Sequence, residues 1–169
     1  MSSSPVEIIE ALSMHSQLEK LELISMNIGR NECVALANLA FTELRALNLS
    51  NNNLDDEGVD ALVGAFTNCK VDDLVLSSNP NISARGWQCV ANLLECPHSN
   101  LEELHLIKNN IGDGSALVFA NALSTNPKLK MLGLEDNDIT AEGWSGFSKV
   151  LCDASSINST FLSNHTLQE

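Results

Sequence analysis

One eleven-residue pattern, L-x-x-L-x-L-x-x-N-x-L, recurs at regular intervals along almost the whole of this 169-residue chain. Six segments carry it: in full at Leu44–Leu54, Leu101–Ile111 and Leu129–Ile139, with one residue inserted at Val71–Ile82, and weakened at Leu18–Ile28 and Ile157–Leu167. Their starting residues are separated by 26, 27, 30, 28 and 28 positions. A period of this length predicts a fold in which one small unit is repeated and each copy packs against its neighbours.

Each unit is predicted to contain a short strand followed by a helix. Positions 4 and 6 of the pattern are apolar while positions 3, 5 and 7 vary, as in a strand with one buried face. The residue after the last apolar position is of a type that helix N-caps favour: Gly29, Asp55, Ser83, Gly112 and Thr140. Counted from that last apolar position, apolar or small residues then recur 5, 7, 8, 11 and 12 positions later, which is one face of a helix.

Alternating strands and helices predict the arrangement of the whole chain. Consecutive strands joined by a helix run parallel through right-handed crossovers. We therefore expect an α/β solenoid, a right-handed horseshoe arc with a parallel sheet on its concave face and helices on its convex face. Five full repeats begin at residues 18, 44, 71, 101 and 129; a capping helix, from about Pro5 to Met14, lies in 1–17, and 157–169 form a degenerate C-terminal capping repeat. The expectation is a single domain over 1–169.

Four asparagines occupy the same turn position of successive repeats: Asn52, Asn79, Asn109 and Asn137. The chain leaves the strand at this point, so backbone groups lie near the core without a strand partner. An amide side chain offers two donors and an acceptor that can satisfy them. We expect a structural ladder of amides rather than a row of ligand-binding groups.

The charge balance limits the classes of partner. The chain has 22 acidic and 9 basic residues and a formal net charge of −13. Nucleic acid and anionic membranes are poor partners for such a surface, whereas a basic protein would fit it. No apolar stretch approaches the length of a membrane span, and the first residues lack the pattern of a signal peptide.

Five cysteines, an odd number, favour a reduced chain and a cytoplasmic location. Four N-x-[ST] sequences, at Asn48, Asn81, Asn158 and Asn164, point the other way, although an asparagine-rich sequence produces such triplets by chance.

No catalytic or metal-binding site is predicted. His105 is expected to point out of the sheet with Glu103 on its own strand and Asp73 and Glu135 on adjacent strands, which is the minimum for acid–base chemistry. The pattern supplies no nucleophile or pocket beside it. The segment 136–138 faintly resembles a calcium loop, but Asn137 is needed inside the turn. We therefore expect no enzyme activity, no metal and no cofactor.

The repeat resembles a known family. A period of 26 to 30 residues with a full helix in each unit, together with Leu101–Gly112 and Ile139–Gly143, is similar to the ribonuclease-inhibitor-like class of leucine-rich repeat proteins. This resemblance covers nearly the whole chain. It implies an intracellular protein-binding scaffold whose concave face carries recognition. The signature residues are structural, so the motif does not specify the partner.

By alternation, positions 3, 5 and 7 face the concavity. Apolar residues surrounded by charges there have the anatomy of a protein–protein site. The residues expected to contact a partner are Glu22, Asn48, Asp73, Val75, Glu103, His105, Ile107, Lys108, Met131, Glu135 and Phe161. The first hypothesis is a monomeric, non-enzymatic module that binds a protein or peptide on this face and the adjoining turns. The alternatives are a regulator of a partner enzyme such as a small GTPase, and a structural or assembly fragment of a longer repeat protein.

Overall fold

The computed structural model describes residues 5–12, 15, 17–39, 42–66 and 69–151. Within them, strands and helices alternate along the chain. The strands are β1 (Lys20–Glu22), β2 (Ala46–Asn48), β3 (Asp73–Val75), β4 (Glu103–His105) and β5 (Met131–Gly133). The helices are α1 (Pro5–Leu12), α2 (Arg30–Ala37), α3 (Asp56–Phe66), α4 (Ala84–Glu95), α5 (Asp113–Leu123) and α6 (Ala141–Leu151).

The strands form one parallel sheet in the order of the sequence, β1 to β5. Equivalent positions of the repeat pair with one another, as Leu47 does with Leu74 and Leu74 with Leu104. The ladder continues beyond the three-residue strands, since the Lys108 N–H donates to the Glu135 carbonyl at 3.0 Å. Side chains at position 7 therefore belong to the same face as those at positions 3 and 5.

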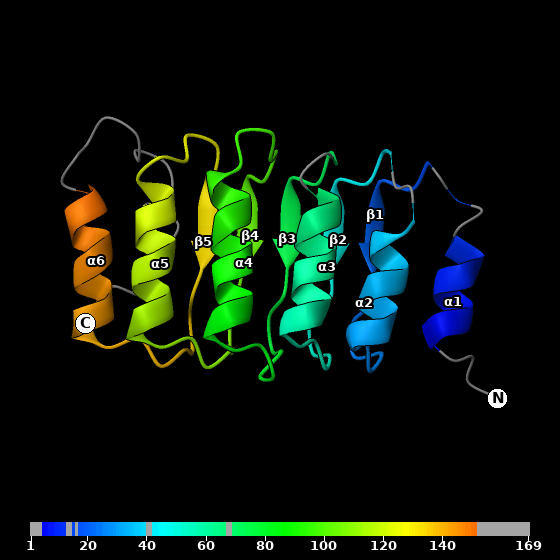
Figure 1. Cartoon of the computed structure of the whole chain (residues 1–169), viewed down its shortest axis with the longest axis horizontal. Helices are drawn as coiled ribbons and strands as arrows, with labels where there is room; N and C mark the ends of the chain where they lie inside the picture. The colour runs from blue at the N-terminus through cyan, green and yellow to red at the C-terminus, as the bar shows by residue number, and fades with distance from the viewer. Residues whose placement is uncertain (1–4, 13–14, 16, 40–41, 67–68, 152–169) are drawn as a thin grey trace.

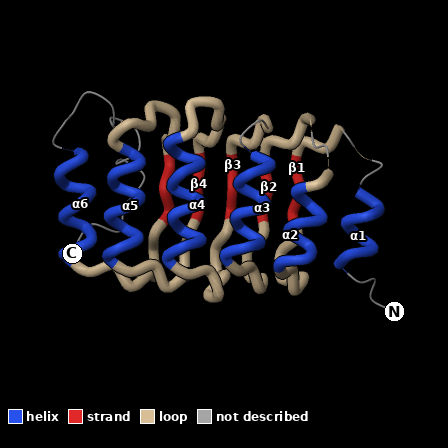
Figure 2. The backbone as a smooth tube through the Cα atoms, in the orientation of Figure 1, coloured by secondary structure: helices blue, strands red, loops and turns tan. Residues whose placement is uncertain are grey.

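The molecule has two layers (Figures 1 and 2). All described helices lie on one side of the sheet, and the strands are more closely spaced than the helices, so the strand face is the inside of the curve. Among the described helices, each one packs only against the helices next to it in the sequence. These findings confirm the predicted α/β solenoid. None of its described helices combines the length and the apolar character needed to cross a bilayer.

The core lies between the layers and is formed by the apolar pattern positions and the inner helix faces. Leu49, Leu104 and Phe119 have no exposed surface. The position seven residues after the pattern was predicted to be buried, but Cys89 there is only half-buried, because this helix position lies at the margin of the core face. A position missed by the prediction, four residues after the pattern, is buried and small: Gly58, Gly86, Ser115 and Gly143.

Two of these glycines make room for an aspartate from the preceding repeat. Asp56 Oδ1 accepts hydrogen bonds from the N–H groups of Ser83, at 2.7 Å, and Gly86, at 3.1 Å. A β-carbon on Gly86 would lie 2.6 Å from that oxygen. Asp113 and Gly143, two repeats further along the chain, form the same arrangement. A β-carbon on Gly143 would lie 2.5 Å from Asp113 Oδ1. The first turn of one helix thus caps the next helix.

The asparagine ladder is confirmed. Asn79 and Asn109 have no exposed surface, and Asn52 is 5% exposed. The Asn79 N–H donates to Asn109 Oδ1 at 2.6 Å, while Asn109 Nδ2 donates to the Leu76 carbonyl at 2.9 Å. Asn137 is half-buried and bonds in the same way, accepting from the Asn109 N–H at 2.9 Å. Each side chain fixes the turn of the preceding repeat.

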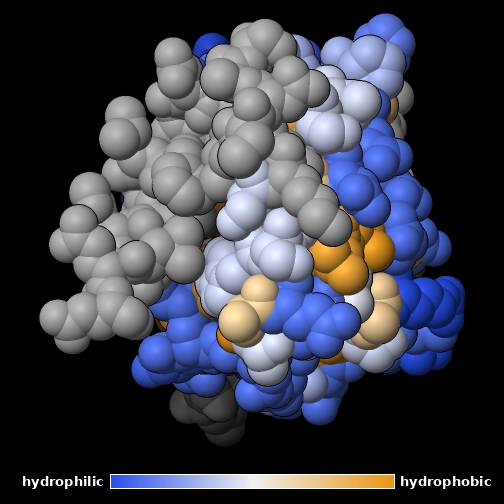
Figure 3. Space-filling view, turned by 90° about the vertical axis from the view of Figure 1, so that its left-hand side faces the viewer, coloured by the Kyte–Doolittle hydropathy of each residue, from blue (hydrophilic) through white to orange (hydrophobic). Residues whose placement is uncertain are grey.

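The end of the solenoid that carries α6 is seen in Figure 3. Its described surface is mostly hydrophilic, with small hydrophobic areas near the middle. Phe161 and the repeat expected at 157–169 lie outside the described residues. They stay expectations.

Candidate functional site on the strand face

The register places the side chains of two repeat positions in two rows along the sheet. Position 3 contributes Lys20, Ala46, Asp73, Glu103 and Met131. Position 5 contributes Glu22, Asn48, Val75, His105 and Gly133. Seven of the eleven residues expected to contact a partner lie in these rows. The described helices all lie on the other side of the sheet, so none of them covers this face (Figure 1).

Three more expected residues follow the strands. Ile107 and Glu135 stand at position 7, where the ladder continues. Lys108 is exposed, has a left-handed backbone with φ of 60°, and lies 3.6 Å from Asp136 in an ion pair. Left-handed backbone recurs at this position in all five repeats, with Ser25, Asn51, Ser78 and Asp136 as its other members. The turn, rather than the side chain, therefore sets the direction in which Lys108 leaves the sheet.

The apolar residues of the face are less exposed than anticipated. Val75, Ile107 and Met131 are half-buried, because side chains on neighbouring strands pack against each other. The large apolar residue most exposed on this face is Ile24, with 45% of its surface accessible. Ile24 occupies position 7 of its repeat, as Ile107 does, so the pattern predicts that it faces the concavity. It was not among the residues expected to contact a partner, because those were chosen mainly from the C-terminal half.

Acidic groups and one histidine gather in the middle of the face. Nε2 of His105 lies 3.6 Å from Glu103 Oε2. Burial raises the pKa of Asp73, the attraction of His105 opposes the rise, and repulsion from Glu103 adds to it. Asp73 Oδ1 is shielded from solvent and has no hydrogen-bond partner among the described residues. The sequence predicted that these residues face outward together, but not that one carboxylate oxygen is unpaired.

Gly133 and Glu135 enclose part of the face. Gly133 takes its predicted place in the position-5 row and is buried there. A β-carbon there would lie 3.2 Å from Glu135 Oε2, 3.5 Å from His105 Nδ1 and 3.5 Å from Ile107 Cγ1. The missing side chain of Gly133 therefore leaves a recess that its neighbours enclose. Glu135 Oε2 is shielded there, again without a described hydrogen-bond partner.

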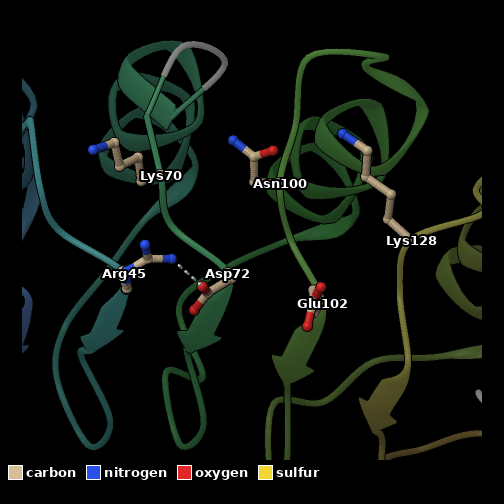
Figure 4. Close-up of a pocket in the computed structure, with 6 residues that line it drawn as sticks. All are labelled: Arg45, Lys70, Asp72, Asn100, Glu102 and Lys128. Atoms are coloured by element: carbon tan, nitrogen blue, oxygen red, sulfur yellow. Dashed lines mark hydrogen bonds and ion pairs between the residues drawn. The ribbon is translucent and has the colours of Figure 1, made fainter.

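A groove at the edge where the strands begin was not predicted. It has a volume of about 430 Å³ and is lined by Arg45, Lys70, Asp72, Asn100, Glu102 and Lys128. Figure 4 shows that these residues come from successive repeats, with Arg45 and Asp72 directed toward one another. Their ion pair measures 3.2 Å. The sequence did contain a signal for it: pattern position 2 is charged in four successive repeats, as Arg45, Asp72, Glu102 and Lys130.

Comparison with known proteins gives the family context. The leucine-rich repeat family matches residues 42–63, 98–120 and 125–148. The chain is 30% identical over 158 residues to ribonuclease inhibitor of Mus musculus, covering 90% of this chain and 34% of the inhibitor. It is 28% identical over 157 residues to NACHT, LRR and PYD domains-containing protein 4C of Mus musculus, covering 90% of this chain and 16% of that protein. The chain thus spans about a third of the first relative and about a sixth of the second.

Solved structures share the fold at low sequence identity. Actin-binding site 2 of leiomodin-1 aligns with a TM-score of 0.72 and 19% identity over 90% of both chains. The tropomodulin C-terminal domain of Caenorhabditis elegans aligns with a TM-score of 0.67 and 16% identity, over 88% of this chain and 92% of that domain. At this level of identity the likeness shows the architecture alone.

Proposed function

Because the chain is a leucine-rich repeat protein of the ribonuclease-inhibitor-like class, we propose that it is a non-enzymatic module that binds a protein or peptide on its strand face. The observation that carries the proposal is the register: equivalent positions of successive strands form rows on a face that no described helix covers. Half-buried apolar side chains stand there among carboxylates, which is the composition of a protein-binding centre with a charged rim.

The charge of the face favours a partner with cationic groups. Asp73 and Glu135 each hold an oxygen without a described hydrogen-bond partner, so both can accept from lysine or arginine. Lys20 pairs with Glu22 at 2.9 Å and Lys108 pairs with Asp136, so these nearby lysines have other partners. A protein ligand is also in keeping with the relative named ribonuclease inhibitor, whose name refers to a protein target.

The area of the sheet indicates that the contact extends beyond the strands. Five strands about 4.8 Å apart with about 13 Å of outward-facing backbone give an area on the order of 300 Å². A standard interface takes about 800 Å² from each partner. We propose that the turn containing Lys108 and the groove lined by Arg45 and Lys128 complete the surface.

Photo-crosslinking tests the choice of face. A photoreactive amino acid replaces Val75 on the strand face or, as the matched control, Val34, which is 42% exposed on α2. Purified partner should cross-link from the Val75 position and not from the Val34 position. Cross-linking from Val34 alone would place recognition on the helix face and overturn the proposal.

A further inference from the structure

Two neighbouring strands bring three metal-ligating side chains together. Asp73 of β3 pairs in register with Glu103 of β4, and His105 follows two residues later on the same side of the sheet. One ligand atom from each residue can be chosen so that all three lie within 4.8 Å of one another. We propose that Asp73, Glu103 and His105 bind a divalent transition-metal ion of the zinc type.

The distances are close to those that an ion requires. Zinc bonds of about 2.0 to 2.1 Å in a tetrahedral arrangement place ligand atoms about 3.3 Å apart. His105 Nε2 and Glu103 Oε2 are already separated by 3.6 Å. The ligand atom of Asp73 lies within 4.8 Å of both, so an ion would have to draw the three atoms somewhat closer together. The sheet therefore supplies a rigid base for the three ligands.

An unpaired oxygen on Asp73 supports the site independently of the distances. Its Oδ1 atom is shielded from solvent and has no hydrogen-bond partner among the described residues. No described lysine or arginine forms an ion pair with Asp73 or Glu103. A buried carboxylate oxygen without a donor or a cation is costly. A dication bound here would supply that missing partner and offset the repulsion between the two acids.

Glu135 is suited to orient the histidine. Nε2 of His105 faces Glu103, whereas Nδ1 borders the recess over Gly133 that also receives Glu135 Oε2. Metal-binding histidines commonly donate their second ring N–H to a carboxylate, which fixes the ring and strengthens the ligand. Glu135 would act as a positioning residue of this kind. When His105 binds metal through Nε2, its Nδ1–H would then be the missing hydrogen-bond partner of Glu135 Oε2.

The mixture of ligands selects the class of ion. Calcium and magnesium prefer six or more oxygen ligands, so an imidazole among three protein ligands is unfavourable for them. One imidazole and two carboxylates suit zinc and related transition metals. Three protein ligands leave one position for water. The sequence predicted no metal site because it could not show how closely these side chains converge.

Zinc titration without any protein partner tests the site, so its outcome is independent of the proposed function. Metal-free protein is titrated with zinc by calorimetry, and one ion per chain is expected. His105→Gln and Glu103→Gln should each weaken zinc binding at least 10-fold. Glu135→Gln should weaken it about 10-fold, as is usual for a group that accepts from the second ring N–H of a metal-binding histidine. The matched control is His98→Gln, an exposed histidine before β4, which should not change the affinity.

Spectroscopy separates this site from the cysteines. Cys69, Cys89 and Cys96 are free and partly exposed, and thiolates also bind zinc. Cobalt(II) bound at the proposed site should lack the intense near-ultraviolet band of thiolate ligation, and zinc should shift the ring-nitrogen resonances of His105 in the wild-type protein. Absence of zinc binding, or binding that survives His105→Gln with a thiolate band, would overturn the proposal. An unshifted His105 resonance would do so even if a variant misfolded.

Discussion

At the scale of single residues, the turns depend on a few buried amides that hydrogen-bond to the backbone. Asn109 has no exposed surface and connects two repeats, accepting from Asn79 N–H at 2.6 Å and donating to the Leu76 carbonyl at 2.9 Å. Neither backbone group can turn to water instead. Without the amide, the Leu76 carbonyl keeps a hydrogen bond from Asn79 Nδ2 at 3.0 Å, but the Asn79 N–H is left unpaired. An unpaired buried group costs more than an ordinary hydrogen bond contributes.

Asn109→Ala should therefore destabilise the protein by about 1 to 3 kcal/mol for each backbone group that it leaves unpaired. Asn121→Ala, at an exposed position of α5, is the control and should change stability by less than about 0.5 kcal/mol. Denaturant unfolding followed by circular dichroism measures both. Equal midpoints for the two variants would contradict a structural role for the ladder.

These residues could be predicted from the sequence because one turn geometry demands one chemistry at every repeat. Prediction was less complete on the strand face. The alternation of positions placed Asp73, His105 and Glu135 on one surface, as the register confirms for the first two. The recess over Gly133 and the shielded oxygen of Glu135 depend on side-chain rotamers and on the neighbouring strand. A one-dimensional pattern does not specify either.

At the scale of elements, successive helices are connected at their first turns. Asp113 in α5 accepts from the N–H of Thr140, before α6, at 2.7 Å and from its hydroxyl at 2.7 Å. The hydrogen bonds from Thr140 are the main reason that the pKa of Asp113 is lowered. The N-cap preference of Thr140 was visible in the sequence. The contribution of Asp113 was not, because it comes from the preceding repeat.

The lowered pKa of Asp113 gives a pH dependence. Its contribution to stability is present above the unfolded-state pKa and is lost as pH falls through the folded-state pKa, so the loss occurs below about pH 4. Asp113→Asn should lower the melting temperature near neutral pH, and the difference from wild type should shrink in acid. Glu142→Gln, an exposed change in α6, is the control. A constant difference between wild type and Asp113→Asn from neutral to acidic pH would contradict this cap.

The glycine that admits Asp113 gives a second prediction at this scale. A β-carbon on Gly143 would lie 2.5 Å from Asp113 Oδ1 and 3.1 Å from Asp113 Cα, so Gly143→Ala should displace the cap and lower the melting temperature. At Gly64 in α3 a β-carbon would meet no atom within 4 Å. Gly64→Ala should instead stabilise the helix by about 0.5 to 1 kcal/mol. The same sign of change for both variants in thermal melts would show that contact with Asp113 is unimportant.

At the scale of the whole molecule, stability is built from contacts between neighbouring repeats. The described helices and strands touch only the elements of adjacent repeats. This explains why a repeated pattern was sufficient to predict the architecture: each unit needs only its neighbours to bury its apolar face. The partner could not be predicted in the same way, because the residues of the strand face vary from repeat to repeat, from Ala46 to Asp73 to Met131.

Neighbour-dependent stability predicts a gradient of local opening. Amide hydrogen exchange should be slowest in β3 and β4, which have described strands on both sides, and faster in β1, which pairs only with β2 among the described strands. Native-state exchange followed by mass spectrometry would resolve the difference. Protection that is equal in β1 and β4 would instead indicate that the described repeats open as one unit.

The proposed use of the strand face is tested most directly by equilibrium titration of the purified partner protein against two variants. Ile107→Ala combined with Met131→Ala removes half-buried apolar contacts from the strand face, and Val34→Ala removes an exposed one from α2. The strand-face variant should weaken binding by about 2 kcal/mol or more, as expected for residues at an interface centre, while the α2 variant binds as wild type does. Unchanged binding by the strand-face variant together with loss in Val34→Ala would contradict the account.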